Sequence, residues 1–145
     1  MSGPDEALRA AYLATTWSVR APGGTLHLAP GRPAPRPLRP AAIVTAYNPA
    51  SVHTSAAENR IAARRLLAQV VVLGVPYLPA RAHAPDPRWN EPGVALLGPA
   101  APAAAVLLGV EWGQNAILAV DDAGLVYLVA TRPGFCGRGA GEVIG

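Results

Sequence analysis

The sequence predicts an α+β domain with a mainly antiparallel sheet and two or three helices packed on it. Of the 145 residues, 51% are hydrophobic, which allows one sizeable core without disulfides. Short apolar segments occur in pairs across turn sequences, as the strands of antiparallel hairpins do. The helical and strand-like segments do not alternate regularly, which argues against a doubly wound parallel sheet.

The N-terminal part predicts a helix followed by a hairpin. Residues 4–6 begin with proline and continue with two acids, which suits the first turn of a helix. The apolar face that follows extends this helix over about residues 4–15. Trp17–Val19 and Leu26–Leu28 alternate with polar residues on either side of a glycine-rich turn, so we expect these two segments to pair.

Residues 30–40 contain five prolines, which exclude a helix and a central strand. Arg32, Arg36 and Arg39 lie between these prolines. We expect an extended surface loop, with a polyproline ligand for a partner domain as the alternative. The next segment, Ala41–Tyr47, is apolar and predicts a buried strand.

A second helix is marked by signals at both of its ends. Ser55 and Glu58 have the spacing of a capping box. The helix is expected to run to about Leu73 and to end at Gly74. Asn59 is in phase with the apolar face of this helix, so its side chain is expected to point inward at the edge of the core.

The second half of the chain predicts further strands and one more helix. Val75–Ala80 contains two prolines and is expected to be an edge strand. The remaining elements are a strand, a short helix and a hairpin, over Gly93–Leu97, Ala100–Gly109, Gln114–Val120 and Leu125–Ala130. Residues 133–145 are rich in glycine and predict a flexible tail behind a single domain over residues 1–132.

Composition excludes several classes of function. The formal charge is +3, every basic residue is arginine, and the arginines are scattered, so we do not expect nucleic-acid binding. Cys136 is the single cysteine, which excludes an intrachain disulfide and fits the cytoplasm. We recognise no signal peptide, membrane span, zinc-ligand spacing or phosphate loop, so we expect a cytoplasmic protein without membrane contact, metal or cofactor.

Four short polar segments lie at the edges of the apolar ones, within Ile43–Pro49, Glu58–Asn59, Trp89–Glu91 and Gly113–Ile117. In this order and spacing they resemble the bacterial family called domain of unknown function 3293. The resemblance covers about residues 10–130 and implies a small, soluble, single-domain bacterial protein. It implies no activity.

The amides, carboxylates and tryptophan of these segments suggest one shared polar site. Its expected ligand-binding residues are Thr45, Asn48, Asn59, Trp89, Gln114 and Asn115. Its tentative catalytic residues are Glu91 and Glu58, and no residue is expected to bind a metal.

Each of these residues also has a structural interpretation. Asn48 precedes a proline and suits an Asx turn, Asn59 could brace that turn, and Glu58 could cap its helix. Only one of Gln114 and Asn115 can face a given pocket, because neighbours on a strand point in opposite directions.

Three functions follow from these residues. The first is a domain that binds a small polar or nucleotide-like molecule in an amide-rich pocket. The second is an enzyme with Glu91 or Glu58 as general acid or base; shielding of Glu91 by Trp89 would raise its pKa. The third is a non-enzymatic protein-interaction module.

Overall fold

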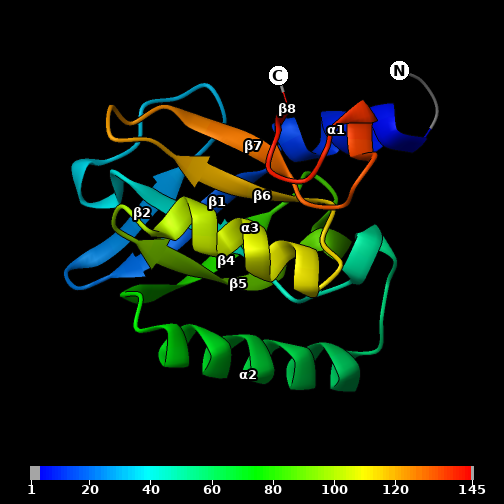
Figure 1. The fold of residues 1–145 in the computed structure, drawn as a ribbon, viewed down its shortest axis with the longest axis horizontal. Coiled ribbons are helices and arrows are strands. Elements are labelled where there is room, and N and C mark those ends of the chain that lie inside the picture. Colours follow the sequence, from blue (N-terminus) through cyan, green and yellow to red (C-terminus); the bar gives the residue numbers. More distant parts are fainter. Residues whose placement is uncertain (1–3, 145) are drawn as a thin grey trace.

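The computed structural model describes residues 4–144 and confirms the α+β class. Its antiparallel sheet has the strand order β2-β1-β4-β5-β3-β6-β7-β8 (Figure 1). The strands are β1 (Thr16–Ala21), β2 (Gly24–Leu28), β3 (Ala41–Val44), β4 (Tyr77–His83), β5 (Glu91–Leu97), β6 (Ala116–Val120), β7 (Val126–Ala130) and β8 (Val143–Ile144). The helices are α1 (Pro4–Leu13), α2 (Ala56–Leu73) and α3 (Ala101–Glu111).

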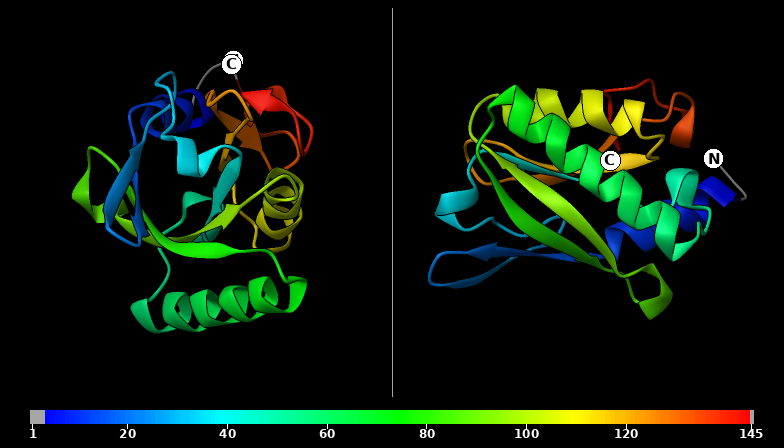
Figure 2. Two further views of the ribbon diagram at one scale, coloured as in Figure 1. Left: turned by 90° about the vertical axis from the view of Figure 1, so that its left-hand side faces the viewer. Right: turned by 90° about the horizontal axis from the view of Figure 1, so that it is seen from below.

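The sheet is curled, and both of its faces are covered (Figure 2). Helices α2 and α3 lie side by side on the convex face, whereas α1 lies across the open side of the curl. Strand β3 shows the resulting alternation: Ala41 and Ile43 belong to the core on the concave side, and Ala42 and Val44 to the core under α2 and α3. A strand buried on both faces needs the continuous apolar sequence seen there.

Helix α2 begins and ends as its sequence predicts. The Ser55 hydroxyl accepts a hydrogen bond from the Glu58 backbone N–H at 3.1 Å, and Gly74 ends the helix in the left-handed conformation. Asn59 is buried together with Leu66 and Val70, as the periodicity requires. The helix therefore delivers one amide to the edge of the core.

Strand β4 is longer and more central than the edge strand expected over Val75–Ala80. It pairs with β5 along its length, but with β1 only from Ala80 to His83. Pro79 lies just outside the segment shared with β1, so its missing N–H leaves no gap in that ladder. Tyr77–Pro79 pair with β5 alone, as expected of an edge, whereas the proline-free part of the strand, from Ala80 onward, pairs with β1.

The loop over residues 30–40 packs inward, unlike the surface loop that the prolines predicted. Ala34 and Leu38 are buried in the core on the concave side. The Ala34 N–H donates to the Gly124 carbonyl at 2.9 Å in the turn between β6 and β7, and the Arg39 Nε donates to the Ala34 carbonyl at 2.6 Å. The loop thereby covers one end of the curl.

The segment 133–145 was expected to be a flexible tail, and its described part is packed. Phe135 is fully buried, and its ring meets the Tyr12 ring edge to face, with the ring centres 6.0 Å apart. Strand β8 pairs with β7 through Val143 and Ile144. A single aromatic residue and one short strand therefore fix a segment whose composition is otherwise that of a loop.

In the described part of the chain, no helix combines the length and the apolar character needed to cross a membrane.

Candidate functional site

The concave side of the sheet contains a cavity of about 460 Å³, a volume typical of small-molecule sites. Its walls are mainly apolar and include Leu8, Trp17, Ile43, Leu118 and Leu128. Leu8 comes from α1 and the others come from β1, β3, β6 and β7, so the cavity exists only because the sheet curls and α1 covers it.

A row of three residues crosses the sheet on the cavity side. Trp17 on β1 lies opposite Ala82 on β4, and Ala82 lies opposite Glu91 on β5. Directly paired residues of antiparallel strands point to the same face, and all three line the cavity. The small Ala82 side chain leaves space between the indole and the carboxyl group.

Glu91 brings a carboxyl group to this apolar cavity, where few protein groups bind its oxygens or balance its charge. Its Oε2 accepts a hydrogen bond of 2.7 Å from Asn48 Nδ2. Within residues 4–144 the carboxyl group makes no ion pair and no second hydrogen bond. Burial raises the Glu91 pKa to about 7, and the Asn48 hydrogen bond lowers it by less than burial raises it. The carboxyl group therefore changes charge near neutral pH.

Asn48 and Asn59 hold each other instead of facing the cavity. The Asn48 N–H donates to Asn59 Oδ1 at 3.0 Å, and Asn59 Nδ2 donates to Asn48 Oδ1 at 2.9 Å. The same Asn48 oxygen accepts from the Thr54 N–H at 2.9 Å. Both asparagines are buried, and neither lines the cavity. These hydrogen bonds hold the loop that presents Asn48 Nδ2 to Glu91.

The loop after Asn48 is held in an unusual backbone conformation. Asn48, Ala50 and Ser51 have positive φ angles of 45°, 55° and 58°. Such angles are strained for residues other than glycine and cost roughly 1–3 kcal/mol each, although asparagine tolerates them best. Strain of this kind persists only where surrounding contacts enforce it, and it is often found at binding sites.

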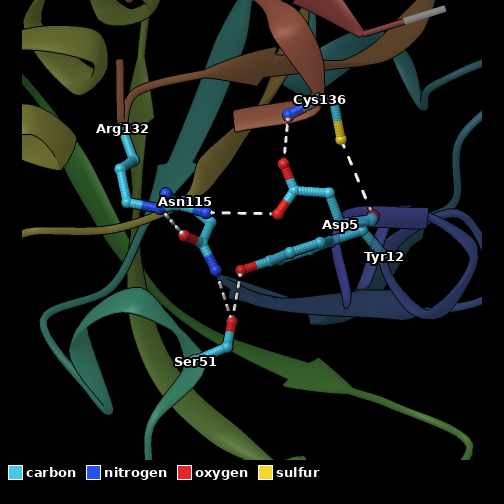
Figure 3. Close-up of polar contacts among 6 residues, drawn as sticks. All are labelled: Asp5, Tyr12, Ser51, Asn115, Arg132 and Cys136. Atoms are coloured by element: carbon cyan, nitrogen blue, oxygen red, sulfur yellow. Dashed lines mark hydrogen bonds and ion pairs between the residues drawn. The ribbon is translucent and has the colours of Figure 1, made fainter. Parts of the chain in front are cut away.

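Ser51 connects this loop to α1 and to the segment before β6. Its hydroxyl lies 3.1 Å from the Tyr12 hydroxyl and accepts a hydrogen bond of 2.8 Å from Asn115 Nδ2 (Figure 3). Asn115 Oδ1 accepts in turn from Arg132 Nε at 2.5 Å. Burial, more than any other effect, raises the Tyr12 pKa, so this phenol remains a neutral hydrogen-bonding group.

Helix α1 is tied down a second time by Asp5. One carboxylate oxygen accepts from the Cys136 backbone N–H at 3.0 Å, and the other lies 3.5 Å from Arg132 Nη2 (Figure 3). Asp5 and Tyr12 thus make polar contacts towards the two ends of the helix, and Leu8 and Tyr12 also pack against the core on the concave side.

Other residues expected at the site also line the cavity. Gln114 Nε2 donates to the Tyr47 carbonyl at 3.1 Å, and Thr45 Oγ1 donates to the Pro92 carbonyl at 2.8 Å. The Thr45 hydroxyl also accepts from the Tyr47 N–H, which turns the chain away from the sheet and ends β3 before the predicted Tyr47. Trp89 lines the cavity as well.

Trp89 is partly engaged by a neighbouring ring. Its indole stacks on His53 with the ring centres 3.9 Å apart and an interplanar angle of 23°. Of the two, Trp89 lines the cavity, whereas His53 is exposed. Asp86 also lines the cavity, but it is paired with Arg88 at 2.7 Å.

The geometry differs from an amide-rich pocket. Gln114 lines the cavity, whereas Asn48, Asn59 and Asn115 are occupied by other protein groups. Glu58 is exposed and does not line the cavity, because it lies in the first turn of α2 on the solvent side.

Sequence reasoning missed Tyr12, Ser51 and Trp17 as lining residues. Tyr12 carries a signal, since it is a phenol on the apolar face of an N-terminal helix. Nothing in the sequence pattern indicates that α1 would cover the concave side of the sheet.

Two kinds of ligand find no partner in the described part of the site. Residues 4–144 contain no group of His, Cys, Asp and Glu side chains arranged to hold a metal ion. The described residues that line the cavity include no Arg or His, so they offer a phosphate group no cationic side chain.

A family model described as Protein of unknown function (DUF3293) matches residues 44–117, about half of the chain, and confirms the resemblance inferred from the sequence. The matched segment includes the Asn48–Asn59 contact and Glu91. No curated protein and no solved structure is significantly similar to the chain.

Proposed function

We propose that this chain, which belongs to the family described as Protein of unknown function (DUF3293), binds a small organic molecule in the cavity of the concave sheet face. The family description assigns no activity, so the function is inferred from the residues of the chain itself. The observation that carries the proposal is the Glu91 carboxyl group, held by Asn48 at the side of an apolar cavity with no counter-charge among the described residues. Ionising the Glu91 carboxyl group in this apolar place is costly. A ligand that supplies a hydrogen-bond donor or a positive charge would reduce that cost, which gives the carboxyl group a role in binding.

The strained loop supports the same proposal. Residues 48–51 adopt positive φ angles at three positions. In this loop the Asn48 side chain contacts Glu91 and the Ser51 side chain contacts Tyr12. Ser55 caps the start of helix α2 by accepting from the Glu58 N–H, so capping alone does not require this strain.

Recognition would differ from the amide-rich pocket that the sequence suggested. Apolar walls would accept the body of the ligand, and the Glu91 carboxyl group, to whose Oε1 no described residue donates, would orient it. Nucleotides fit this arrangement poorly, because the described lining residues offer no partner for phosphate.

A thermal-shift screen with metabolites tests the proposal. A ligand at about a hundred times its Kd should raise the unfolding midpoint by roughly 5 °C or more. Ala82→Leu should abolish the shift, because its larger side chain projects between Trp17 and Glu91. Ala57→Leu makes the same change on the exposed first turn of α2 and is the control. If ligands bind equally well to Ala82→Leu, the cavity is not the site.

A second candidate function is general acid–base catalysis, and the Glu91 pKa of about 7 is the observation that favours it. Glu91 would exchange a proton with the bound molecule, while the Tyr12 and Ser51 hydroxyls orient it. Mass spectrometry of each ligand found in the screen, after incubation with the wild type and with Glu91→Gln, separates the two functions. A product formed by the wild type alone supports catalysis, and an unchanged ligand supports binding.

A further inference from the structure

We infer that the ligand is an organic cation, an amine with an apolar body, whose ammonium group pairs with Glu91 inside the cavity. The inference rests on the proposed function and names the chemical class of its ligand.

The charges that line the cavity are the first reason. The ionisable carboxyl groups among the described lining residues are those of Asp86 and Glu91, and no cationic side chain accompanies them. Arg88 pairs with Asp86 through hydrogen bonds of 2.7 to 3.2 Å and compensates its charge from outside the cavity. Glu91 is left as the one described lining carboxyl group that has no cation beside it.

The hydrogen bonds of Glu91 are the second reason. Asn48 Nδ2 occupies Oε2 at 2.7 Å, and no described residue donates to Oε1. An ionised carboxyl group accepts several hydrogen bonds and donates none, so Oε1, which water still reaches, can accept a hydrogen bond from a ligand donor. An ammonium group supplies both the donor and the opposite charge.

The aromatic lining is the third reason. Tyr12, Trp17 and Trp89 all line the cavity, and their ring faces attract cations. His53 stacks on the Trp89 indole, and the indole also lines the cavity. The same rings favour an apolar or aromatic ligand body.

Other ligand classes fit this lining less well. A carboxylate or phosphate ligand would meet Glu91 without a cation among the described lining residues to offset the repulsion. A neutral ligand would displace water and leave Glu91 either ionised without a counter-charge or obliged to take up a proton. An ammonium group removes that penalty.

Three probes with one body and three charges provide the test: tryptamine, tryptophol and indole-3-propionate, titrated by calorimetry at pH 8. The indole ring fits a volume of about 460 Å³. Tryptamine should bind about tenfold or more tightly than tryptophol, and indole-3-propionate should bind weakest. Butylamine and phenethylamine, with their alcohols and carboxylates, extend the series to smaller bodies.

Two variants test whether the preference for amines over alcohols depends on Glu91. Glu91→Gln should reduce amine affinity about tenfold or more and leave that of the alcohols nearly unchanged, because the new amide can still accept from Asn48. Glu58→Gln is the matched control, since it makes the same change on an exposed side chain outside the cavity and should keep the amine preference.

The outcomes separate the two proposals. If alcohols or carboxylates bind as tightly as the matching amines, or if Glu91→Gln keeps the preference, the ligand class is wrong and the cavity remains a binding site. If no amine binds while a compound from the metabolite screen does, the ligand class is again wrong. If neither the series nor the screen gives a ligand, both the ligand class and the binding function fail.

Discussion

Glu91 holds its proton more tightly in the folded protein than in the unfolded chain. Burial raises its pKa from 4.5 to about 7, so between these pH values the native state binds more protons than the unfolded state. The free energy of unfolding consequently falls as the pH rises through this window. The contribution is fully favourable below about pH 4.5 and is lost above about pH 7. Glu91 therefore opposes folding at high pH.

Glu91→Gln should remove this pH dependence. The amide can accept the Asn48 hydrogen bond but cannot ionise, so at pH 8 the variant should be more stable than the wild type. We expect a gain of roughly 2 kcal/mol after allowing for the part of the carboxyl group that water reaches. At pH 4 the two proteins should differ little. Urea denaturation at both pH values measures the difference, and a variant less stable than the wild type at pH 8 would contradict the account.

Asn48→Asp should have the opposite effect at high pH. The new carboxylate cannot donate to Glu91 and places a second negative charge beside it, while it still accepts from Thr54 and Asn59. We expect a loss of about 2–3 kcal/mol at pH 8 and a smaller loss at pH 5, where Glu91 is protonated. Urea denaturation gives both values. Asn90→Asp, at an exposed neighbour of Glu91, is the control, and equal losses in the two variants would refute the Asn48 contact.

The inward direction of Asn59 was predictable because helical periodicity is local. The partner of the Asn59 amide was not predictable from the sequence. It is Asn48, eleven residues away, whose backbone N–H and side-chain oxygen both bond to Asn59. An amide alone does not reveal whether protein or ligand will satisfy it. Glu91 was recognised as a candidate because a tryptophan precedes it closely, and that tryptophan lines the same cavity.

Among the structural elements, the proline-rich segment 30–40 contributes most beyond its predicted role. Its prolines determine where backbone hydrogen bonds cannot form, and this much is readable from the sequence. Whether Leu38 points outward or inward depends on the β6–β7 turn, which lies more than eighty residues away. The loop is therefore part of the core although its composition is that of a linker.

Leu38→Ala should destabilise the protein as a core truncation does. Leu38 is fully buried, so its loss leaves a cavity and should reduce the free energy of unfolding by about 2–5 kcal/mol. Arg36→Ala, two residues earlier on an exposed side chain, should change it by less than about 0.5 kcal/mol. Urea denaturation distinguishes the two, and equal small effects would show that the loop does not pack inward.

The segment after β7 makes a similar contribution. Phe135 lies against Tyr12, and the Arg132 guanidinium carbon lies 5.2 Å from the centre of the Phe135 ring. Its composition predicted flexibility because one phenylalanine among glycines gives no periodic pattern. Its burial follows from its place beneath α1, which only the folded chain defines.

Phe135→Ala should therefore affect both stability and the cover of the cavity. We expect a loss of about 3–5 kcal/mol in the free energy of unfolding. The amides of α1 should also exchange hydrogen faster, because the ring that Tyr12 packs against is gone. Val143→Ala, on an exposed side chain of β8, should leave α1 exchange unchanged. Unaltered α1 exchange in Phe135→Ala would mean that this contact does not hold the helix.

For the whole molecule, the two-sided burial of the sheet was predictable in outline and the cavity was not. Continuous apolar segments at Ala41–Val44 and Ala116–Val120 indicate strands covered on both faces. The curl of the sheet and the position of α1 depend on strand order, which the sequence pattern does not specify. The cavity is a product of both, so only those of its lining residues that lie in conspicuous polar segments could be recognised in advance.

Glu91 is a partly desolvated carboxyl group at the side of an apolar cavity, and its pKa reports how far burial removes it from water. The most direct test is a ¹³C NMR titration of the Glu91 side-chain carboxyl in the ligand-free protein, with the resonance assigned from its absence in Glu91→Gln. The account predicts a Glu91 pKa of about 7. A pKa near 4.5, the ordinary value, would show that water solvates the carboxyl group freely and would contradict the account.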